Sequence, residues 1–415
     1  MRPIEVLENE NKNLEDFKEL FNKKCDTKYI SSSLPSVKRI IVFGDIHGDY
    51  NLALLFLLTS GVIKINNTNT NKNKNKIEWI GGKTVIVQVG DQIDRCRPRK
   101  SEITGELLLC DNSETMGDDD DDADEDVLEL YEHVHNLAVK HGGAVYSLLG
   151  NHELMNSLGN VSYASYKELL KSSLPNSVNK IESGKNERKR LFAPGNKYGN
   201  FLGCNRFPFL IIGSNIFVHA GMVDGLLEEL ELKKNDLEII SRSIRLWLWN
   251  QLKNPEQIKK IIQGSQFSPF WTRLLGSIER GVKMSDKRCS DNIKNVLELF
   301  NVDRIIVGHT PKIDEGITGT CYEEKNETYR VWDVDIAVSK AFDKVTKYKR
   351  KLQFLVIDDD TKFSICDMNG CREEVRPNNL NYKDKDKDKD KFNFNFDQKI
   401  SDEEMKEIKQ YIKNL

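Results

Sequence analysis

Short apolar runs recur along the chain, and each is bounded by glycine or polar residues. An apolar run of this kind between turn residues predicts a buried β-strand. The runs that lead into polar motifs lie at Val37 to Phe43, Thr84 to Val89, Val145 to Leu149, Ile211 to Val218 and Arg304 to Val307. Since open α/β sheets bind ligands at the carboxyl ends of their strands, the polar residues after each run are candidates for a common site.

Between these runs, apolar residues recur at helical spacing, which predicts amphipathic helices. The helices are expected over about 12–24, 51–59, 126–141, 235–252 and 290–300. Further strands are expected after the last polar motif, near Tyr329 to Asp335, Leu352 to Ile357 and Lys362 to Asp367. These strands are expected to continue the sheet in antiparallel order. The pattern as a whole predicts an α/β (α+β) fold.

Low-complexity segments interrupt this pattern near 64–78 and 97–126. The first segment is rich in Asn and Lys and cannot bury apolar surface, which predicts a disordered insertion. The second segment ends in the acidic block Asp118 to Asp126, and such blocks are typical of solvated loops. A docking or metal-buffering role is the alternative for this block.

The two ends of the chain are expected to differ from its centre. Residues 1–36 are expected to form a helical extension, and residues 37–376 the main domain. Residues 377–398 include alternating Lys and Asp, which predicts a charged, disordered linker. A capping-box pattern at Ser401 to Glu404 then predicts a C-terminal helix over 399–415.

The formal net charge of the 415-residue chain is −3. A nucleic-acid-binding protein would normally carry a concentrated basic face, so nucleic acid is not an expected partner. Residues 1–20 lack the apolar core of a signal peptide. The longest apolar run, Leu52 to Leu58, is too short to span a membrane. An intracellular, cytoplasmic protein without a membrane partner is therefore expected.

The eight cysteines contain no CxxC pair and no zinc-knuckle spacing. Reduced thiols are therefore expected. Cys366 and Cys371 flank Asn369-Gly370, and a two-residue turn at that pair would place the two sulfurs diagonally across a hairpin. That arrangement would leave them too far apart for an easy disulfide.

The residues at the strand ends are mainly carboxylates and imidazoles, with one amide. Such a mixed set of oxygen and nitrogen donors suits Mn²⁺, Fe or Zn²⁺ and lacks the thiolates of a structural zinc site. The set is larger than one open catalytic ion uses, so two metals that share a carboxylate are expected. The candidate metal ligands are Asp45, His47, Asp91, Asn151, His219 and His309.

The motifs GDIHGD, GDQIDR, GNHE, VHAG and VGHT occur in this order between Gly44 and Thr310. Together they resemble the signature of the calcineurin-like metallophosphoesterases, in particular the phosphoprotein phosphatase branch. The strings GNHELMNSLG, SPFWTR and WDVDIAVS are similar to those of the Shewanella-like protein phosphatases. The resemblance covers about 37–345 and implies a four-layer αββα sandwich of two mixed sheets flanked by helices. It makes 37–376 a metallophosphatase catalytic domain.

The resemblance also implies how the ligands are divided between two divalent ions, with Mn²⁺ as the first expectation and Fe or Zn²⁺ as alternatives. One ion would be bound by Asp45, His47 and the bridging Asp91. The second ion would be bound by Asp91, Asn151, His219 and His309.

The remaining roles of the site follow from the same resemblance. Arg95 and Arg273 would bind the phosphate together with Asn151, because a guanidinium offers a planar charged fork to phosphate oxygens. His152 would be the general acid that protonates the leaving group, and Asp94 the carboxylate that orients it. A hydroxide that bridges the metals would attack phosphorus directly, without a phosphoenzyme.

Two positions depart from the family pattern. Cys96 stands where glycine usually follows the Asp-Arg pair, and its thiol would be either redox-sensitive or buried and inert. Asp335 replaces a residue that is often glycine, which would change the local turn. The insertions near 64–78 and 97–126 fall on loops, where added length is tolerated.

The leading hypothesis is a metal-dependent phosphoprotein phosphatase whose partner is a phosphorylated protein or peptide. A symmetrical dinucleoside polyphosphate hydrolase shares GDIHG and GNHE and is the alternative enzyme. A phosphate-binding scaffold without turnover is the non-enzyme alternative, and it is disfavoured because no ligand position is substituted. The choice between phosphotyrosine and phosphoserine or phosphothreonine, and any regulatory partner, stay open.

Overall fold

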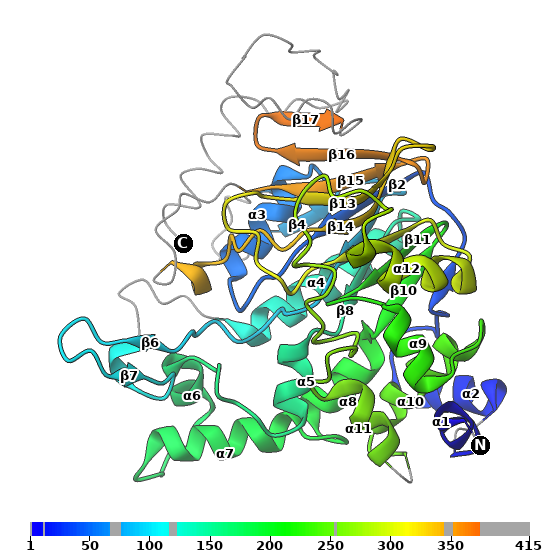
Figure 1. The fold of residues 1–415 in the computed structure, drawn as a ribbon. Helices are drawn as coiled ribbons and strands as arrows, with labels where there is room; N and C mark the ends of the chain where they lie inside the picture. The colour runs from blue at the N-terminus through cyan, green and yellow to red at the C-terminus, as the bar shows by residue number, and fades with distance from the viewer. Residues whose placement is uncertain are drawn as a thin grey trace.

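A computed structural model describes residues 2–10, 13–66, 76–115, 123–252, 255–343 and 352–373. In this part of the chain, two mixed β-sheets stack on each other and helices cover both outer faces (Figure 1). The predicted fold class, an αββα sandwich, is therefore confirmed. The predicted linker and C-terminal helix, at 377–398 and 399–415, lie outside the described residues.

The larger sheet is built around three adjacent parallel strands, β2, β5 and β8. Parallel strands end at the same edge of a sheet, so the loops that follow these three lie together. The C-terminal strands extend the sheet on one side in antiparallel order. Across the sheet the order is β17 (Gly370–Glu373), β16 (Lys362–Asp367), β15 (Phe354–Asp358), β2 (Arg39–Phe43), β5 (Val85–Gln88), β8 (Ala144–Leu148) and β9 (Arg206–Phe207).

The smaller sheet contains a second parallel set, β11, β12 and β14. The strands after the last polar motif were expected to continue one sheet, and this expectation was wrong: β13 and β14 belong to the smaller sheet and β15 to β17 to the larger. Apolar runs buried on both faces do not reveal which sheet they join. Across the smaller sheet the order is β1 (Ser33–Leu34), β10 (Phe209–Ile212), β11 (Asn215–Val218), β12 (Arg304–Val307), β14 (Thr328–Asp333) and β13 (Thr318–Glu323).

Alternate residues of the central strands face the opposite sheet and the outer helices. In β2, Ile40 and Val42 pack in the core between the two sheets, whereas Ile41 and Phe43 pack under the helices. In β11, Phe217 faces the other sheet. Burying one such side chain fully contributes about 1.5–3 kcal/mol to stability. Burial on both faces explains why these strands appear in the sequence as continuous apolar runs.

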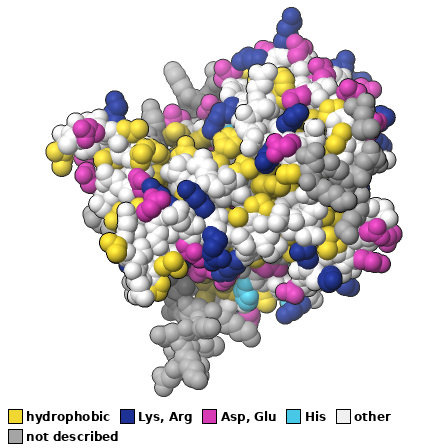
Figure 2. All heavy atoms as spheres, turned by 90° about the horizontal axis from the view of Figure 1, so that it is seen from below, with side chains coloured by type: hydrophobic (Ala, Val, Ile, Leu, Met, Phe, Trp, Pro, Cys, Tyr) yellow, Lys and Arg dark blue, Asp and Glu magenta, His cyan; other side chains and the backbone are white. Residues whose placement is uncertain are grey.

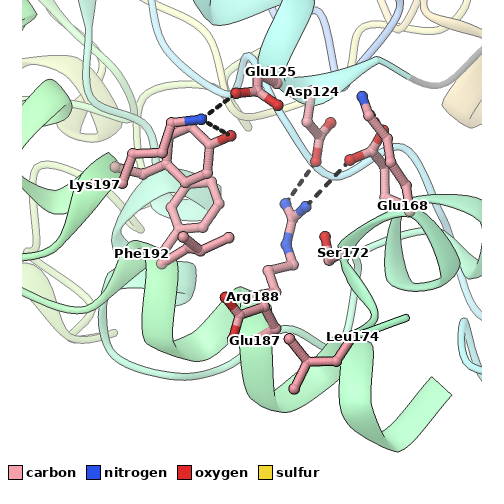
Figure 3. A pocket seen from close by; sticks show the side chains of 12 residues that line it. Asp124, Glu125, Glu168, Ser172, Leu174, Glu187, Arg188, Phe192 and Lys197 are labelled. Atoms are coloured by element: carbon pink, nitrogen blue, oxygen red, sulfur yellow. Dashed lines mark hydrogen bonds and ion pairs between the residues drawn. The ribbon is translucent and has the colours of Figure 1, made fainter. Parts of the chain in front are cut away.

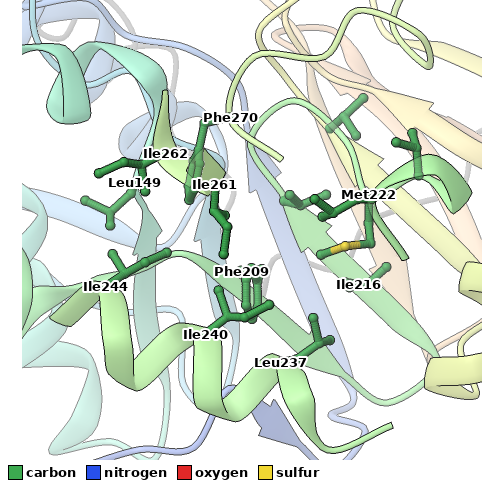
Figure 4. Close-up of a cluster of buried hydrophobic side chains, with 14 of the residues drawn as sticks. Leu149, Phe209, Ile216, Met222, Leu237, Ile240, Ile244, Ile261, Ile262 and Phe270 are labelled. Carbon is green, nitrogen blue, oxygen red and sulfur yellow. The ribbon is translucent and has the colours of Figure 1, made fainter. Parts of the chain in front are cut away.

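The outer helices complete the four layers. Helices α3 and α4 cover the larger sheet, and the smaller sheet packs against a set that includes α10. Figure 4 shows Ile240 and Ile244 of α10 beside Phe209 and Ile216 of the smaller sheet. The helices are α1 (Pro3–Glu10), α2 (Leu14–Lys24), α3 (Tyr50–Thr59), α4 (Asp124–Val139), α5 (Asn151–Ser157), α6 (Tyr166–Ser172), α7 (Lys180–Phe192), α8 (Lys197–Asn205), α9 (Asp224–Leu230), α10 (Asp236–Leu248), α11 (Glu256–Ile262) and α12 (Lys287–Phe300).

The N-terminal segment packs closely on the main body of the protein. The helix predicted over 12–24 is confirmed as α2, and its Phe17 and Phe21 lie against Trp249 at ring-centroid distances of 5.7 and 5.8 Å. Helix α1 contributes Ile4 to the core beside the smaller sheet. Both helices therefore bury apolar surface that would otherwise be exposed to water.

The two insertions contain regular structure where they are described. Strands β3 (Ile63–Asn66) and β4 (Lys76–Trp79) pair as a hairpin, so the ends of the first insertion are ordered. Its predicted disordered centre lies outside the described residues. The second insertion forms the hairpin β6 (Arg99–Lys100) and β7 (Leu107–Leu108), which Figure 1 shows beside α6. A short helix, η1 (Ser113–Thr115), follows this hairpin.

All eight cysteines are paired in disulfides, so the expectation of reduced thiols was wrong. The partners lie up to 179 residues apart in sequence, and no local spacing reveals such pairs. Disulfides persist in oxidising compartments. The cytoplasmic location therefore stays a prediction that the cysteines do not support. The pairs are Cys25–Cys204, Cys96–Cys110, Cys289–Cys321 and Cys366–Cys371.

The C-terminal hairpin also differs from its expected register. Cys366 pairs directly with Cys371, and Asp367 pairs with Gly370. The turn therefore lies one position earlier than expected, which moves the two cysteines from diagonal to opposite positions. Their Cα atoms are 4.0 Å apart, and a disulfide joins them.

Across the described residues, no helix combines the length and the apolar character that a bilayer span requires. Lys and Arg side chains are interspersed with Asp and Glu on the face of the molecule in Figure 2.

Candidate metal and phosphate site

The sheets bring the six predicted metal ligands to one region of the molecule. Each ligand follows directly after a central strand, where the backbone leaves the sheet. All six side chains are buried, with exposed fractions of 6% or less. Asp45 and His47 follow β2, Asp91 follows β5, Asn151 follows β8, His219 follows β11 and His309 follows β12.

The backbone of this region is held in an uncommon conformation at several non-glycine residues. His47, Asp91, Asp94 and His309 have φ values of 49°, 51°, 69° and 67°. A left-handed conformation at a non-glycine residue costs about 1–3 kcal/mol and persists only where the surrounding structure enforces it. The loops are therefore held in shape by their neighbours rather than by local preference.

Gly150 allows two of these loops to touch. A Cβ atom at Gly150 would lie 2.1 Å from Oδ1 and 2.3 Å from the backbone nitrogen of Asp91. Its backbone is extended, with φ −102°, so the requirement for glycine is one of space rather than of torsion. The glycine of the GNHE motif therefore lets the β8 loop approach the carboxylate that is common to both predicted metal sites.

Glu153 fixes the relative position of the same loops. Its Oε2 accepts hydrogen bonds from the backbone nitrogens of Gly150 and Asp91, at 2.7 and 3.0 Å, and its Oε1 accepts one from Gln92 at 2.8 Å. Burial, with the charge of Asp91 next, raises the pKa of Glu153 to about 7. Glu153 therefore holds the β8 loop against the loop that follows β5.

One group of possible ligand atoms comes from His47, Asp91 and His152, all within 4.8 Å of one another. The resemblance predicted Asp45 in this group rather than His152. Asp45 lies at its edge, with Oδ2 3.9 Å from Nε2 of His47. Arg97 approaches the same histidine, with Nη2 2.8 Å from Nε2. The His47 imidazole therefore lies between the carboxylate of Asp45 and the guanidinium of Arg97.

A second group consists of Asp91, His219 and His309, again within 4.8 Å. Asn151 lies among them, since its Oδ1 is 2.8 Å from Nε2 of His219 and 2.8 Å from Nδ1 of His309. The other nitrogen of His219 lies 2.9 Å from the carbonyl of Val89. Such a contact orients an imidazole so that its remaining nitrogen faces the site. Asp91 is common to both groups.

Charge and burial perturb the titration of these ligands. Burial, with Asp335 next, raises the pKa of Asp45 well above its usual range. Burial would also raise the pKa of Asp91, but His219 and other nearby imidazoles hold it well below its usual range. Burial lowers the pKa of His309 to about 3, with His219 adding to the effect. A neutral imidazole is the form that can bind a metal.

These residues fit divalent cations. Asp333 and Asp335 add two further buried carboxylates near Asp45, and each has a side-chain oxygen with no hydrogen-bond partner within the described residues. Concentrated negative charge in a buried site is costly unless a cation compensates it. Two ligand groups that share Asp91 match the arrangement of a two-metal site. The donor set of carboxylate, imidazole and amide matches Mn²⁺, Fe or Zn²⁺.

The predicted acid and its orienting carboxylate are in contact. Nδ1 of His152 lies 2.9 Å from Oδ2 of Asp94. Nε2 of His152 points toward the first ligand group and lies 3.8 Å from Oδ2 of Asp91. The ring of Tyr163 packs edge-on against His152 with centroids 5.0 Å apart. One imidazole nitrogen is therefore fixed by a carboxylate while the other faces the site.

The predicted phosphate-binding arginines occupy different environments. Arg95 directly follows Asp94 and is buried, with an exposed fraction of 8%. Arg273 is exposed, and its Nη1 donates to the carbonyl of His309 at 3.1 Å, which places it at the rim of the site. Arg97 was not predicted. Its guanidinium lies over the ring of Phe342 at 5.0 Å, close to His47.

Sequence reasoning also missed the residues behind the acid. Asp124 belongs to the acidic block that was predicted to be a solvated loop, but it is buried at the start of α4. It contacts Arg188 of α7, and both contact Asp94. The prediction for the block was therefore wrong at this residue. The many neighbouring Asp residues in the sequence gave no sign that Asp124 is buried.

The two departures from the family pattern have different outcomes from those expected. Cys96 is bonded to Cys110 and is neither a free redox-sensitive thiol nor an inert one. Asp335 was expected to change the local turn. The left-handed position of that loop is instead occupied by Ala337, with φ 50°. Asp335 instead accepts a hydrogen bond from the backbone nitrogen of Ala337 at 2.9 Å, which stabilises that turn.

An αββα sandwich that gathers buried carboxylates and imidazoles at its strand ends defines the metallophosphoesterase class of hydrolases. The chain belongs to the calcineurin-like phosphoesterase family, because the model of that family matches residues 38–312. The predicted family is therefore confirmed.

Relatives with sequence similarity include uncharacterized protein R398 of Acanthamoeba polyphaga mimivirus, 39% identical over 57% of this chain and 97% of that protein. Shewanella-like protein phosphatase 2 of Arabidopsis thaliana is 25% identical over 73% of this chain and 72% of its own length. The crystal structure of a cold-active protein-tyrosine phosphatase of a psychrophilic Shewanella sp. has a TM-score of 0.54 at 19% identity, covering 85% and 84% of the two chains. This last similarity shows a shared fold.

Proposed function

We propose that this protein is a dimetal phosphoprotein phosphatase that hydrolyses phosphomonoesters of serine and threonine, tyrosine, or both. The observation that carries the proposal is the position of Asp91, which belongs to both ligand groups and lies beside the His152 imidazole. A shared carboxylate next to an oriented histidine is what a two-metal hydrolysis of a phosphoester requires.

The ligands would bind two divalent ions, most simply Mn²⁺, with Fe or Zn²⁺ as alternatives. When bound, the ions would supply a hydroxide at neutral pH and charge to stabilise the phosphoryl oxygens. One ion would be bound by Asp45, His47 and Asp91, and the other by Asp91, Asn151, His219 and His309.

His152 is the proposed general acid. Its Nδ1 contact with Asp94 orients the ring so that Nε2 faces the site. Transfer of a proton from Nε2 to the oxygen of the departing alcohol would avoid an unstable alkoxide. Arg95, Arg273 and Asn151 would hold the phosphate so that the acid and the departing oxygen stay aligned.

The names of similar proteins support a protein substrate. One relative is named a Shewanella-like protein phosphatase, and a protein with the same fold is titled a protein-tyrosine phosphatase. These two names differ in the phosphorylated residue that they suggest. Both residue classes therefore belong in the first experiment.

The experiment measures hydrolysis of phosphoserine and phosphotyrosine peptides by the protein in the presence of Mn²⁺, because the departing oxygen of each needs a proton. Asp91→Asn and His152→Asn are each expected to lower kcat by about 100-fold or more. His133→Asn is the matched control, because His133 is exposed on α4, away from the ligand groups. Activity that survives both Asp91→Asn and His152→Asn contradicts the proposal.

Two further measurements separate the alternatives. Faster hydrolysis of a dinucleoside tetraphosphate than of a phosphopeptide would favour the polyphosphate hydrolase. Elemental analysis after dialysis against Mn²⁺ should find two ions per chain. A protein that binds no metal and releases no phosphate would instead be a scaffold.

A further inference from the structure

A buried network of charged side chains lies directly behind the proposed acid and is not part of the ligand groups. Its centre is Arg188 of α7, whose side chain is only 3% exposed. Nη2 of Arg188 donates to Oδ1 of Asp94 at 3.0 Å and to Oδ2 of Asp124 at 2.6 Å. Nε donates to Oδ1 of Asn156 at 2.7 Å. Figure 3 shows Arg188 reaching from α7 toward Asp124.

We propose that Arg188 and Asp124 are positioning residues that hold Asp94 and, through it, the acid His152. This inference rests on the proposed phosphatase function and deepens it. Neither residue would touch the substrate. Their effect would be to fix the direction in which the imidazole presents its proton.

Both oxygens of the Asp94 carboxylate are held by neighbouring side chains. Oδ1 accepts from Arg188, and Oδ2 accepts from Asn156 at 2.8 Å while contacting Nδ1 of His152 at 2.9 Å. A guanidinium is a rigid planar donor, so its bond to Oδ1 opposes rotation of the carboxylate. Rotation would also break the contact between Oδ2 and His152. Arg188 therefore fixes the orientation of Asp94, the residue that orients His152.

Asp124 holds the backbone of the same residue. Its Oδ1 accepts from the backbone nitrogen of Asp94 at 3.0 Å, while its Oδ2 accepts from Arg188. Asp94 has a left-handed backbone with φ 69°, which needs such external support. Asp124 thus ties the Asp94 main chain to the arginine that binds its side chain.

Charge links the three central residues of the network to one another. Asp94, Asp124 and Arg188 are each buried, and the arginine binds both carboxylates and offsets part of their charge. Glu168 of α6 lies at the edge, with Oε2 3.9 Å from Nη1 of Arg188. Removal of Arg188 would leave buried carboxylates facing each other without a cation, and Asp94 would be expected to turn away from Asp124.

Arg188 also lines a cavity of about 230 Å³ between α4, α6, α7 and α8 (Figure 3). Space beside the side chain allows a shorter residue to be accommodated without overpacking. Arg188→Met is therefore expected to fold. Arg190→Met is the matched control, since Arg190 is exposed on the same helix and pairs with Glu187.

A displaced acid has a particular kinetic signature. Nitrophenolate leaves an aryl phosphate readily without a proton, whereas the serine oxygen of a serine phosphate needs one to leave. A defect in proton delivery lowers the serine phosphate rate much more than the nitrophenyl phosphate rate. A general loss of structure or metal lowers both rates by the same factor.

The experiment compares kcat/KM of the Mn²⁺-loaded variants for 4-nitrophenyl phosphate and for a phosphoserine peptide. For Arg188→Met, we expect about a 100-fold loss on the peptide and less than about a tenfold loss on the nitrophenyl ester. Arg188→Lys keeps the positive charge but not the planar guanidinium, and its kcat/KM for the peptide is expected to lie between those of Arg188→Met and wild type. Arg190→Met is expected to match wild type on both substrates.

Asp124→Asn provides a second variant if Arg188→Met does not fold, and it should shift the ratio of the two rates in the same direction. An unchanged ratio in the folded variants overturns the inference, whether both rates fall equally or neither falls. That result leaves the proposed function intact, provided that wild type is active and Asp91→Asn is not. A wild-type protein that is inactive on both substrates contradicts the proposed function and the inference together.

Discussion

Replacing Gly150 with alanine adds one methyl group at the contact between the two central loops of the site. The extended backbone of Gly150 is open to alanine, so the substitution introduces no torsional strain. The new Cβ would lie 2.1 Å from Oδ1 of Asp91, whereas real Cβ contacts essentially never fall below 3.0 Å. Asp91 or the Gly150 loop must therefore move by about 1 Å.

The size of the expected effect follows from this displacement. Overpacking of one methyl group costs about 1–3 kcal/mol of folding free energy. A displacement of about 1 Å at a catalytic group can lower the rate by about 100-fold. Because Asp91 belongs to both ligand groups, Gly150→Ala should weaken the binding of both ions rather than of one.

The assays are urea denaturation, Mn²⁺ binding by calorimetry and hydrolysis of an aryl phosphate. Gly264→Ala is the matched control, because the nearest atom to its added Cβ is 3.6 Å away on Trp271. It should change the free energy of unfolding by less than about 0.5 kcal/mol. If Gly150→Ala binds two ions with wild-type affinity and keeps wild-type activity, the close approach of Gly150 to Asp91 is not required, and the reasoning fails.

Three further perturbations test other parts of the structure. Burial raises the pKa of Glu168 to about 7, above its usual 4.5, so wild type should lose stability as pH rises from about 4.5 to 7. In urea denaturation, Glu168→Gln should flatten this pH dependence and should be roughly 3 kcal/mol more stable than wild type at pH 8. Cys110→Ser removes the bond to Cys96, which closes a separation of 14 residues, and should lower the free energy of unfolding by about 3 kcal/mol; an unchanged free energy in urea denaturation would contradict this. Chelation of both ions should lower the free energy of unfolding by about 5 kcal/mol relative to Mn²⁺ at 100 times the Kd of each site, and Asp91→Asn should abolish most of this difference.

The central strands were predictable because they are buried on both faces. Residues such as Ile40 to Phe43 have an apolar partner on each side, so the sequence shows an unbroken apolar run. The polar residue after each run then marks the strand end. That combination located the six candidate ligands, and the structure brings them to one place.

The network around Asp94 could not be predicted in the same way. Arg188 is 94 residues from Asp94 in sequence, and the basic residues that follow it, Lys189 and Arg190, are exposed. Asp124 is one of many acidic residues in its block, and composition does not show which of them is buried. Contacts between side chains on distant helices depend on packing, and no local period reveals them.

The disulfides and the hairpin register were missed for related reasons. Cys25 and Cys204 are brought together only when α2 packs beside α8. The turn before Cys371 was placed by the preference of Asn-Gly for tight turns. Pairing of Cys366 with Cys371 in the sheet instead set the register, and a shift of one residue reversed the conclusion about the bond.

The central claim is that two ions sharing Asp91 catalyse removal of phosphate from proteins. The most direct measurement is release of inorganic phosphate from matched phosphoserine, phosphothreonine and phosphotyrosine peptides by Mn²⁺-loaded wild type and Asp91→Asn. Wild type should release phosphate from at least one peptide, and Asp91→Asn from none at a comparable rate. Absence of release by wild type carrying two ions per chain, or equal release by Asp91→Asn, would contradict the account.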